Sequence, residues 1–201
     1  MLEHVHTILL DELHADALDE RLYTPRHPLR DTGIPGRMLT HWRQQALFLR
    51  TAAPGEHLLL DDTDMAWFRL LQTLRRFGMS IPALRQLKAV LAPSVSLQDV
   101  VATPHGLEIM KGAFGPAAET YIQAAQDQPQ DKAVFQLNYL RYYLHTHSQK
   151  GNQLVLCIRH DGTYMPFAAK QNAKLQALSG YSDWMDEPHI RVPISELIEA
   201  V

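Results

Sequence analysis

The chain has 201 residues, of which 46% are hydrophobic and 20% are charged, and it contains a single cysteine. This composition is typical of a globular protein with a buried core and argues against a disordered chain. No apolar run is long enough for a transmembrane helix, and the N-terminal MLEHVH lacks the basic start of a secretory signal. We therefore expect a soluble, cytoplasmic protein that forms no internal disulfide and no thiolate metal site.

The net charge of −3 conceals an uneven distribution along the chain. Residues 1–20 contain six acids and no Lys or Arg, whereas residues 21–91 contain eleven basic residues, ten of them Arg, against five acids. Residues 92–201 contain eight basic and eleven acidic residues. Because guanidinium groups pair with phosphates through two hydrogen bonds, the middle segment is a candidate for binding a nucleic-acid backbone. The alternative is an ordinary solvated basic surface.

The first half of the chain is predicted to be mainly helical. Residues 2–20 are expected to form an acidic amphipathic helix, 24–32 a short helix, and 37–45 a second short helix. A turn at 51–57 precedes a candidate strand at 58–60. Asp61 and its two neighbours are expected to cap a long helix that stops at Gly78, and Ser80 a helix that reaches about Leu91.

Pro93 marks an expected boundary, after which helices are predicted at 105–126 and 131–149. In the second of these, Ala133, Leu137, Leu140 and Leu144 recur at steps of four, three and four residues. This spacing is typical of a short coiled-coil seam, and an ordinary buried helix face explains it equally well.

Beyond Gly151 the apolar pattern changes to that of strands. Residues 154–158 and 164–168 are expected to form a hairpin with a type I′ turn at Asp161-Gly162, and 189–194 a third strand. The first strand is apolar on both faces, which places it in the centre of the sheet, and Pro166 places the second at an edge. Ser195 is expected to cap a terminal helix. We expect a packed module without a large cavity, and a small-molecule sensor is the alternative.

Three motifs follow one another in the basic segment: TGIPGRMLTHWR at 32–43, GEHLL at 55–59 and LRRFGMSIPALRQL at 74–87. In the third motif a glycine stop, a serine cap and helical apolar spacing coincide. In order and spacing, residues 24–91 resemble the winged helix-turn-helix of the MerR family of bacterial transcription regulators. The resemblance implies that residues 37–45 form a recognition helix and residues 55–59 belong to the wing.

The sequence departs from the family pattern where the family contacts DNA. Thr40, His41 and Arg43 replace the second Arg, the Tyr and the Glu of the usual recognition helix, and His57, Glu56 and Leu59 replace the Arg and the aromatic residues of the wing. Ala46 stands where glycine usually ends the recognition helix, so either the turn into the wing differs or the helix continues. Pro28 in the first helix is tolerated best in the first turn.

The predicted fold is α+β and mainly helical, with an acidic helix at 1–20 and a winged helix-turn-helix at 21–92. A helical linker or dimerisation region at 93–150 and a small α+β module with three strands at 151–201 complete it. The predicted function is sequence-specific binding of double-stranded DNA by a homodimeric transcription regulator, with RNA polymerase as a further candidate partner. The candidate DNA-binding residues are Arg26, Arg37, Thr40, His41, Arg43, Arg50 and His57, and the candidate dimer contacts are Leu137, Leu140 and Leu144.

The alternative function is that of an interaction scaffold that keeps a winged-helix core without reading DNA. A DNA-binding protein should present its arginines on one continuous face, whereas a scaffold should pair them with residues 1–20 or scatter them. No phosphate-binding loop, dinucleotide motif or catalytic nucleophile pattern is present, and His4/His6 and His145/His147 have a spacing that points each pair to different helix faces. Neither enzymatic activity nor a metal or other cofactor is expected.

Overall fold

The computed structural model describes residues 20–22, 24–52, 57–93, 95–96, 136–150, 153–168 and 172–198, and single positions between 102 and 123. The predicted acidic helix and most of the helix predicted at 105–126 lie outside these residues. Within the described part of the chain, no helix is long and apolar enough to cross a membrane.

The N-terminal half begins with short elements that lead into two long helices. In chain order these are η1 (Glu20–Leu22), β1 (His27–Pro28), η2 (Leu29–Thr32), α2 (Gly36–Gln44), β2 (Leu59–Leu60), α3 (Asp62–Arg76) and α4 (Ile81–Leu91). The helix expected at 24–32 is therefore only one 3-10 turn. Its first part is extended instead, because β1 pairs antiparallel with β2, and Gly33 ends the turn in the left-handed conformation.

The caps predicted for α3 and α4 are confirmed. Asp61 and Asp64 form a reciprocal capping box, in which the Asp64 amide donates to Asp61 Oδ1 over 2.9 Å and the Asp61 amide to Asp64 Oδ2 over 3.0 Å. Ser80 accepts the amide of Ala83, and proline occupies the first turn of α4.

The heptad-like seam predicted between Ala133 and Leu144 does not lie on one helix. Gln136–Leu137 form the strand β4, which pairs antiparallel with β3 (Val95–Ser96), and α8 starts only at Tyr139 and runs to Lys150. Leu137 therefore belongs to a strand, and the prediction of a single helical seam is wrong. The pairing of β4 with β3, which lies some forty residues earlier in the sequence, overrides the helical spacing of the local sequence.

The C-terminal part contains the predicted three-stranded sheet. It consists of β5 (Leu154–Ile158), β6 (Tyr164–Ala168) and β7 (Ile190–Pro193) in the order β6-β5-β7, all antiparallel. The central position of β5 and the edge position of β6 are both confirmed. The short helices α9 (Asn172–Gln176), α10 (Tyr181–Asp186) and α11 (Ile194–Ile198) complete the fold, so Ser195 lies inside α11 instead of capping it.

The hairpin turn differs from the predicted type I′. A type I′ turn needs positive φ at both central residues, but among the described hairpin residues only Gly162 has one, at 90°. The Gly162 amide donates to the Arg159 carbonyl over 3.0 Å and the Arg159 amide to the Thr163 carbonyl over 2.9 Å, which gives a three-residue loop. Asp161 Oδ1 accepts the amide and the hydroxyl of Thr163 and stabilises this longer turn.

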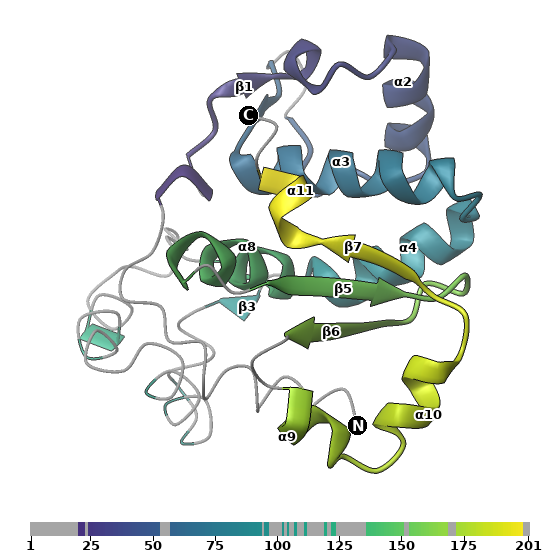
Figure 1. The fold of residues 1–201 in the computed structure, drawn as a ribbon. Helices are drawn as coiled ribbons and strands as arrows, with labels where there is room; N and C mark the ends of the chain where they lie inside the picture. The colour runs from purple at the N-terminus through teal and green to yellow at the C-terminus, as the bar shows by residue number, and fades with distance from the viewer. Residues whose placement is uncertain are drawn as a thin grey trace.

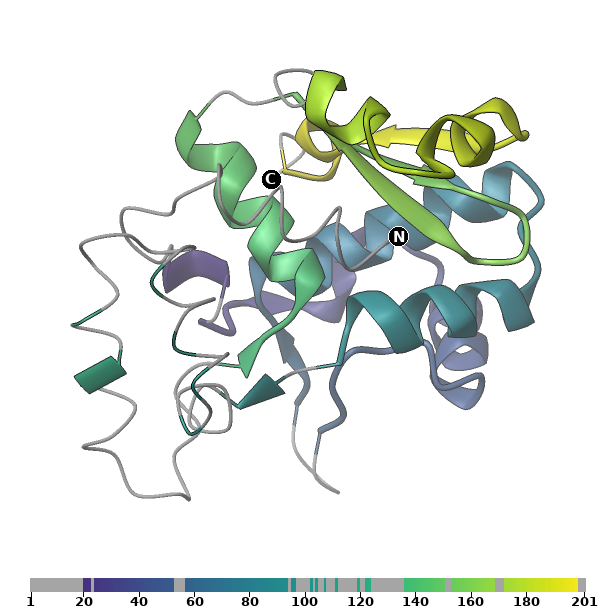
Figure 2. The same ribbon diagram turned by 90° about the horizontal axis from the view of Figure 1, so that it is seen from below.

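The sheet and the helix-turn-helix share one hydrophobic core. Figure 1 shows the sheet beneath α3, with α9 and α10 on its other side, and Figure 2 shows α8 running alongside it. Buried residues from Leu22 through Leu74 and Leu84 to Leu156 and Leu197 form a single cluster. The boundaries expected near residues 92 and 150 therefore do not separate independent cores.

The hairpin tip contacts the helix-turn-helix directly. A Cβ atom added to Gly162 would lie 2.1 Å from the carbonyl oxygen of Ala83 at the start of α4. Glycine is thus required at this position both for its φ and for the close approach of two backbones.

We expect Gly162→Ala to destabilise the protein by more than the cost of a left-handed alanine, which is about 1–2 kcal/mol. Gly78→Ala is the matched control, because Gly78 has φ of 81° and no atom within 4 Å of the added Cβ. Urea unfolding of both variants measures the difference. Equal losses would show that the hairpin does not press on α4.

Candidate nucleic-acid interface

The helix α2 presents a polar face to solvent. Arg37, Thr40, His41 and Gln44 are all exposed, and their spacing of three, four and seven residues places them on one side of the helix. None of the four side chains makes a hydrogen bond or an ion pair with the described residues. This face is therefore available to a partner.

The opposite side of α2 fixes the helix on the core. Trp42 is buried and stacks on Phe68 of α3, with ring centroids 6.1 Å apart and an interplanar angle of 8°. Phe48, just beyond α2, meets the same Phe68 ring edge-on at 4.9 Å. Trp67 of α3 is also buried, and its Nε1 donates to the Leu47 carbonyl over 2.7 Å.

The N-terminus of α2 is suited to an anion. Pro35 precedes the helix and provides no side-chain cap, and the first turn contains no acidic residue. The unsatisfied amides and the helix dipole favour negative charge at this end, where the exposed Arg37 also lies. Arg43 lies on the flank of the helix, with its guanidinium carbon 5.2 Å from the centre of the Phe48 ring.

The C-terminus of α2 turns at Ala46. The helix ends at Gln44, and Ala46 adopts the left-handed conformation with φ of 57°. The alternative of a longer helix is therefore wrong, and a turn that differs from that of the family stays a prediction. Two cations from α4 hold the turn: Arg85 Nε donates to the Gln45 carbonyl over 2.8 Å, and Lys88 Nζ to the Ala46 carbonyl over 2.8 Å and the Phe48 carbonyl over 2.6 Å. Partial burial lowers the pKa of Lys88.

We expect Ala46→Gly to raise the free energy of unfolding by about 0.5–1 kcal/mol, because glycine adopts positive φ without the strain of a Cβ. The control is Ala52→Gly at an exposed position without positive φ, where the same change should lower stability. Chemical denaturation measures both. A loss of stability in Ala46→Gly would contradict the strain described for this turn.

Several arginines of the basic segment form ion pairs or hydrogen bonds with other residues of the same chain. Arg26 forms an ion pair with Asp62 over 2.7 Å, and His27 contacts the same carboxylate over 2.8 Å. Arg69, Arg75 and Arg85 donate to backbone carbonyls. The net charge of residues 21–91 therefore overstates the positive charge available to a partner, and among the described cations Arg37 and Arg43 remain on the surface of α2.

Arg50 lies in a buried charge cluster and not on a free surface. Its guanidinium contacts Asp61 and lies 2.7 Å from Asp64 Oδ2, and its side chain is 28% exposed. Arg141 of α8 donates to Asp61 Oδ2 over 2.9 Å from the other side. Burial and the neighbouring Asp61 raise the pKa of Asp64 to about 7, although Arg50 acts in the opposite direction. The structure thus gives Arg50 a role in the fold.

The remaining candidates stand apart from α2. His57 is exposed next to β2, and residues 55–56 of the expected wing lie outside the described part of the chain, so the wing stays a prediction. Leu140 and Leu144 are 0% and 1% exposed and belong to the core of the same chain. They cannot also form a seam with a second protomer in this conformation.

Two features of the interface were not predicted from the sequence. Gln44 follows Arg37 at a distance of seven residues, a signal that the helical spacing itself contains. Arg85 and Lys88 instead reach over about forty residues to the end of α2, and nothing local in the sequence indicates this contact.

Comparison with known proteins supports the predicted resemblance. Residues 20–90 match the family model described as MerR HTH family regulatory protein, which confirms the resemblance inferred for this segment from the three motifs. No curated protein and no solved structure matches the chain.

Proposed function

Because residues 20–90 carry the helix-turn-helix of the MerR regulatory family, we propose that the protein is a transcription regulator that reads double-stranded DNA in a sequence-specific manner. The observation that carries this proposal is the exposed face of α2, formed by Arg37, Thr40, His41 and Gln44, which makes no hydrogen bond or ion pair with the described side chains. In a helix-turn-helix, this element enters the major groove.

The residues of this face suit distinct parts of DNA recognition. A guanidinium at the uncapped N-terminus of a helix binds a phosphate or the O6 and N7 atoms of a guanine. Thr40, His41 and Gln44 offer hydrogen-bonding groups to base edges, and Gln pairs well with adenine. Arg26 and Arg50 are left out of this contact set because carboxylates hold them within the fold.

The scaffold alternative is supported by one observation, which is that many arginines of the basic segment form ion pairs or hydrogen bonds within the protein. It requires that the exposed face of α2 bind a protein or nothing at all. A salt-titrated binding assay on genomic fragments, including the promoter of the protein's own gene, separates the two functions.

We expect Arg37→Ala to weaken DNA binding by about 1–3 kcal/mol and to relax sequence preference if Arg37 reads a base. If it contacts a phosphate, all sequences should weaken similarly and the salt slope should fall by about one unit. Arg191→Ala is the matched control, because Arg191 is an exposed arginine on β7. Fluorescence anisotropy on duplexes measures both variants.

Wild-type protein that binds no duplex at low salt would support the scaffold and contradict the proposal. Equal effects of Arg37→Ala and Arg191→Ala would mean that net charge, and not the α2 face, determines binding.

We further propose that the regulator acts as a homodimer, since one recognition helix spans only one half-site. The contact must use surface other than Leu140 and Leu144. Tyr139 at the start of α8 is 38% exposed and is the candidate on the described part of that helix.

We expect Leu140→Asp to unfold the protein, because the change places an unpaired charge in the core of the protomer. Tyr139→Asp should leave the protomer folded and weaken self-association. Circular dichroism reports folding and light scattering reports mass. A folded, monomeric Leu140→Asp variant would show that the leucines form the dimer interface after all. A wild type that is monomeric at micromolar concentration would exclude the dimer.

A further inference from the structure

A pocket of about 340 Å³ opens along one side of α3. Its long wall comes from a stripe of α3 residues spaced three and four apart, which includes Phe68, Gln72 and Arg76. Asp31 of η2 and Glu196 of α11 contribute from two other segments. Three parts of the chain that are far apart in sequence thus surround one hollow.

Two short elements flank this side of α3. The turn η2 has four residues, and α11 covers residues 194–198. Figure 1 shows α11 lying against α3, where Arg69 donates to the Leu197 carbonyl and holds it. Among the described residues, the pocket lies between these two elements along α3.

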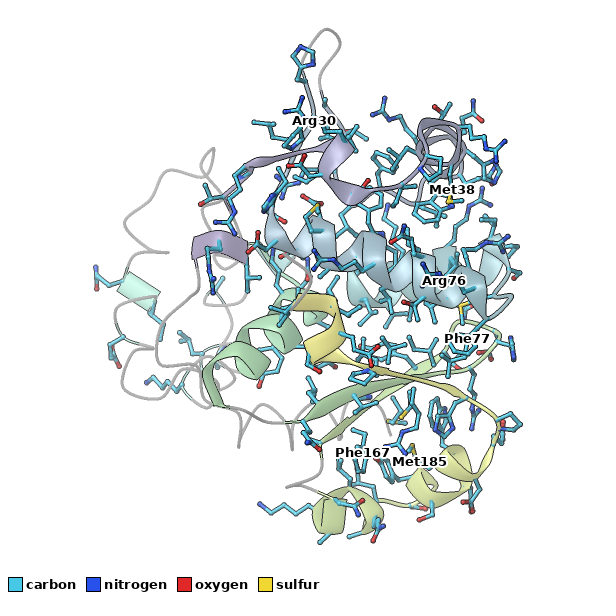
Figure 3. All side chains as sticks on the ribbon, turned by 45° about the horizontal axis from the view of Figure 1, so that its top comes forward. Arg30, Met38, Arg76, Phe77, Phe167 and Met185 are labelled. Carbon is cyan, nitrogen blue, oxygen red and sulfur yellow. The ribbon has the colours of Figure 1, made fainter. Side chains whose placement is uncertain are left out.

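The pocket is lined by positively and negatively charged side chains that form no ion pairs with one another. Arg76, which Figure 3 shows near the C-terminal end of α3, and Glu196 make no ion pair with any described residue. Among the described residues, Asp31 forms an ion pair only with Arg30, over 3.7 Å, and that arginine is 87% exposed. Such a surface pair contributes little, so both carboxylates and the guanidinium are available to a ligand.

The lining of the pocket is mainly polar. Seven of its nine residues are polar or charged, and the two apolar ones, Met65 and Phe68, are almost completely buried. Pockets that bind small molecules begin at about 300 Å³. The volume here admits a compact molecule and excludes a macromolecular segment.

We propose that this pocket binds a small zwitterion, a molecule with a carboxylate for Arg76 and an ammonium group for Glu196 and Asp31. Free α-amino acids are the simplest members of this class. A ligand with only one of the two charges would leave a charged group of the pocket unpaired, so both are needed for recognition.

Occupation of the pocket bears on DNA binding, and this consequence rests on the proposed function. The residues Gly33–Pro35 connect η2 directly to the N-terminus of α2. A ligand that bridges η2 to α3 therefore restricts the position of Arg37, and the DNA affinity changes when the pocket is filled.

The binding test needs no DNA. The full-length protein is titrated by calorimetry with free proteinogenic L-amino acids at millimolar concentration. At least one should bind saturably, and its methyl ester and its N-acetyl derivative, each lacking one charge, should not. Arg76→Ala and Glu196→Gln should each weaken binding about tenfold or more.

The controls are Arg191→Ala and Glu187→Gln, which remove the same groups from positions outside the pocket. They should leave the affinity unchanged. If no amino acid binds, or if the pocket variants bind as tightly as wild type, the pocket proposal is wrong. A ligand that binds normally to a protein without DNA affinity would refute only the proposed function.

Discussion

The carboxylate of Asp61 connects the parts of this protein that lie farthest apart in the sequence. It is fully buried and accepts hydrogen bonds from the amide of Asp64, from Arg50 before the helix and from Arg141 on α8. A buried carboxylate is unfavourable unless charged donors surround it, so these contacts depend on one another. They fix where α3 begins, and through α3 they position η2, α2 and the sheet. The arginines that make the segment basic are therefore partly components of the fold.

The helix α3 has a different partner on each side. Leu70, Leu71 and Leu74 are fully buried in the core shared with the C-terminal segments, and Phe68 packs against Trp42 of α2. The polar residues of α3 line the pocket, and Phe68 also contributes to its wall. A single rigid helix thus contacts both the element proposed to read DNA and the segment that follows the helix-turn-helix, without an intervening flexible joint among the described residues.

The sequence predicted those elements whose signals are local. Ser80, Gly78 and the continuous apolar run of residues 154–158 are local signals. From such signals α3, α4 and the order of the sheet were predicted correctly. The errors arose where distant residues meet. The pairings of β1 with β2 and of β3 with β4 make two helices shorter than predicted. Arg50 was predicted to bind DNA, but it contacts Asp61 and Asp64 instead. The α2 face was predicted through Arg37, Thr40 and His41 because helical spacing is itself local.

The contact of Gly162 with Ala83 also limits how this protein can be divided into parts. In a modular regulator, the DNA-binding segment can be exchanged between proteins because it folds autonomously. Here the hairpin tip and α11 seal the same core as the helix-turn-helix, so a fragment that ends near residue 92 would leave Leu74 and Leu84 without their cover. A chimera that transplants residues 20–92 therefore has to carry the C-terminal sheet with it.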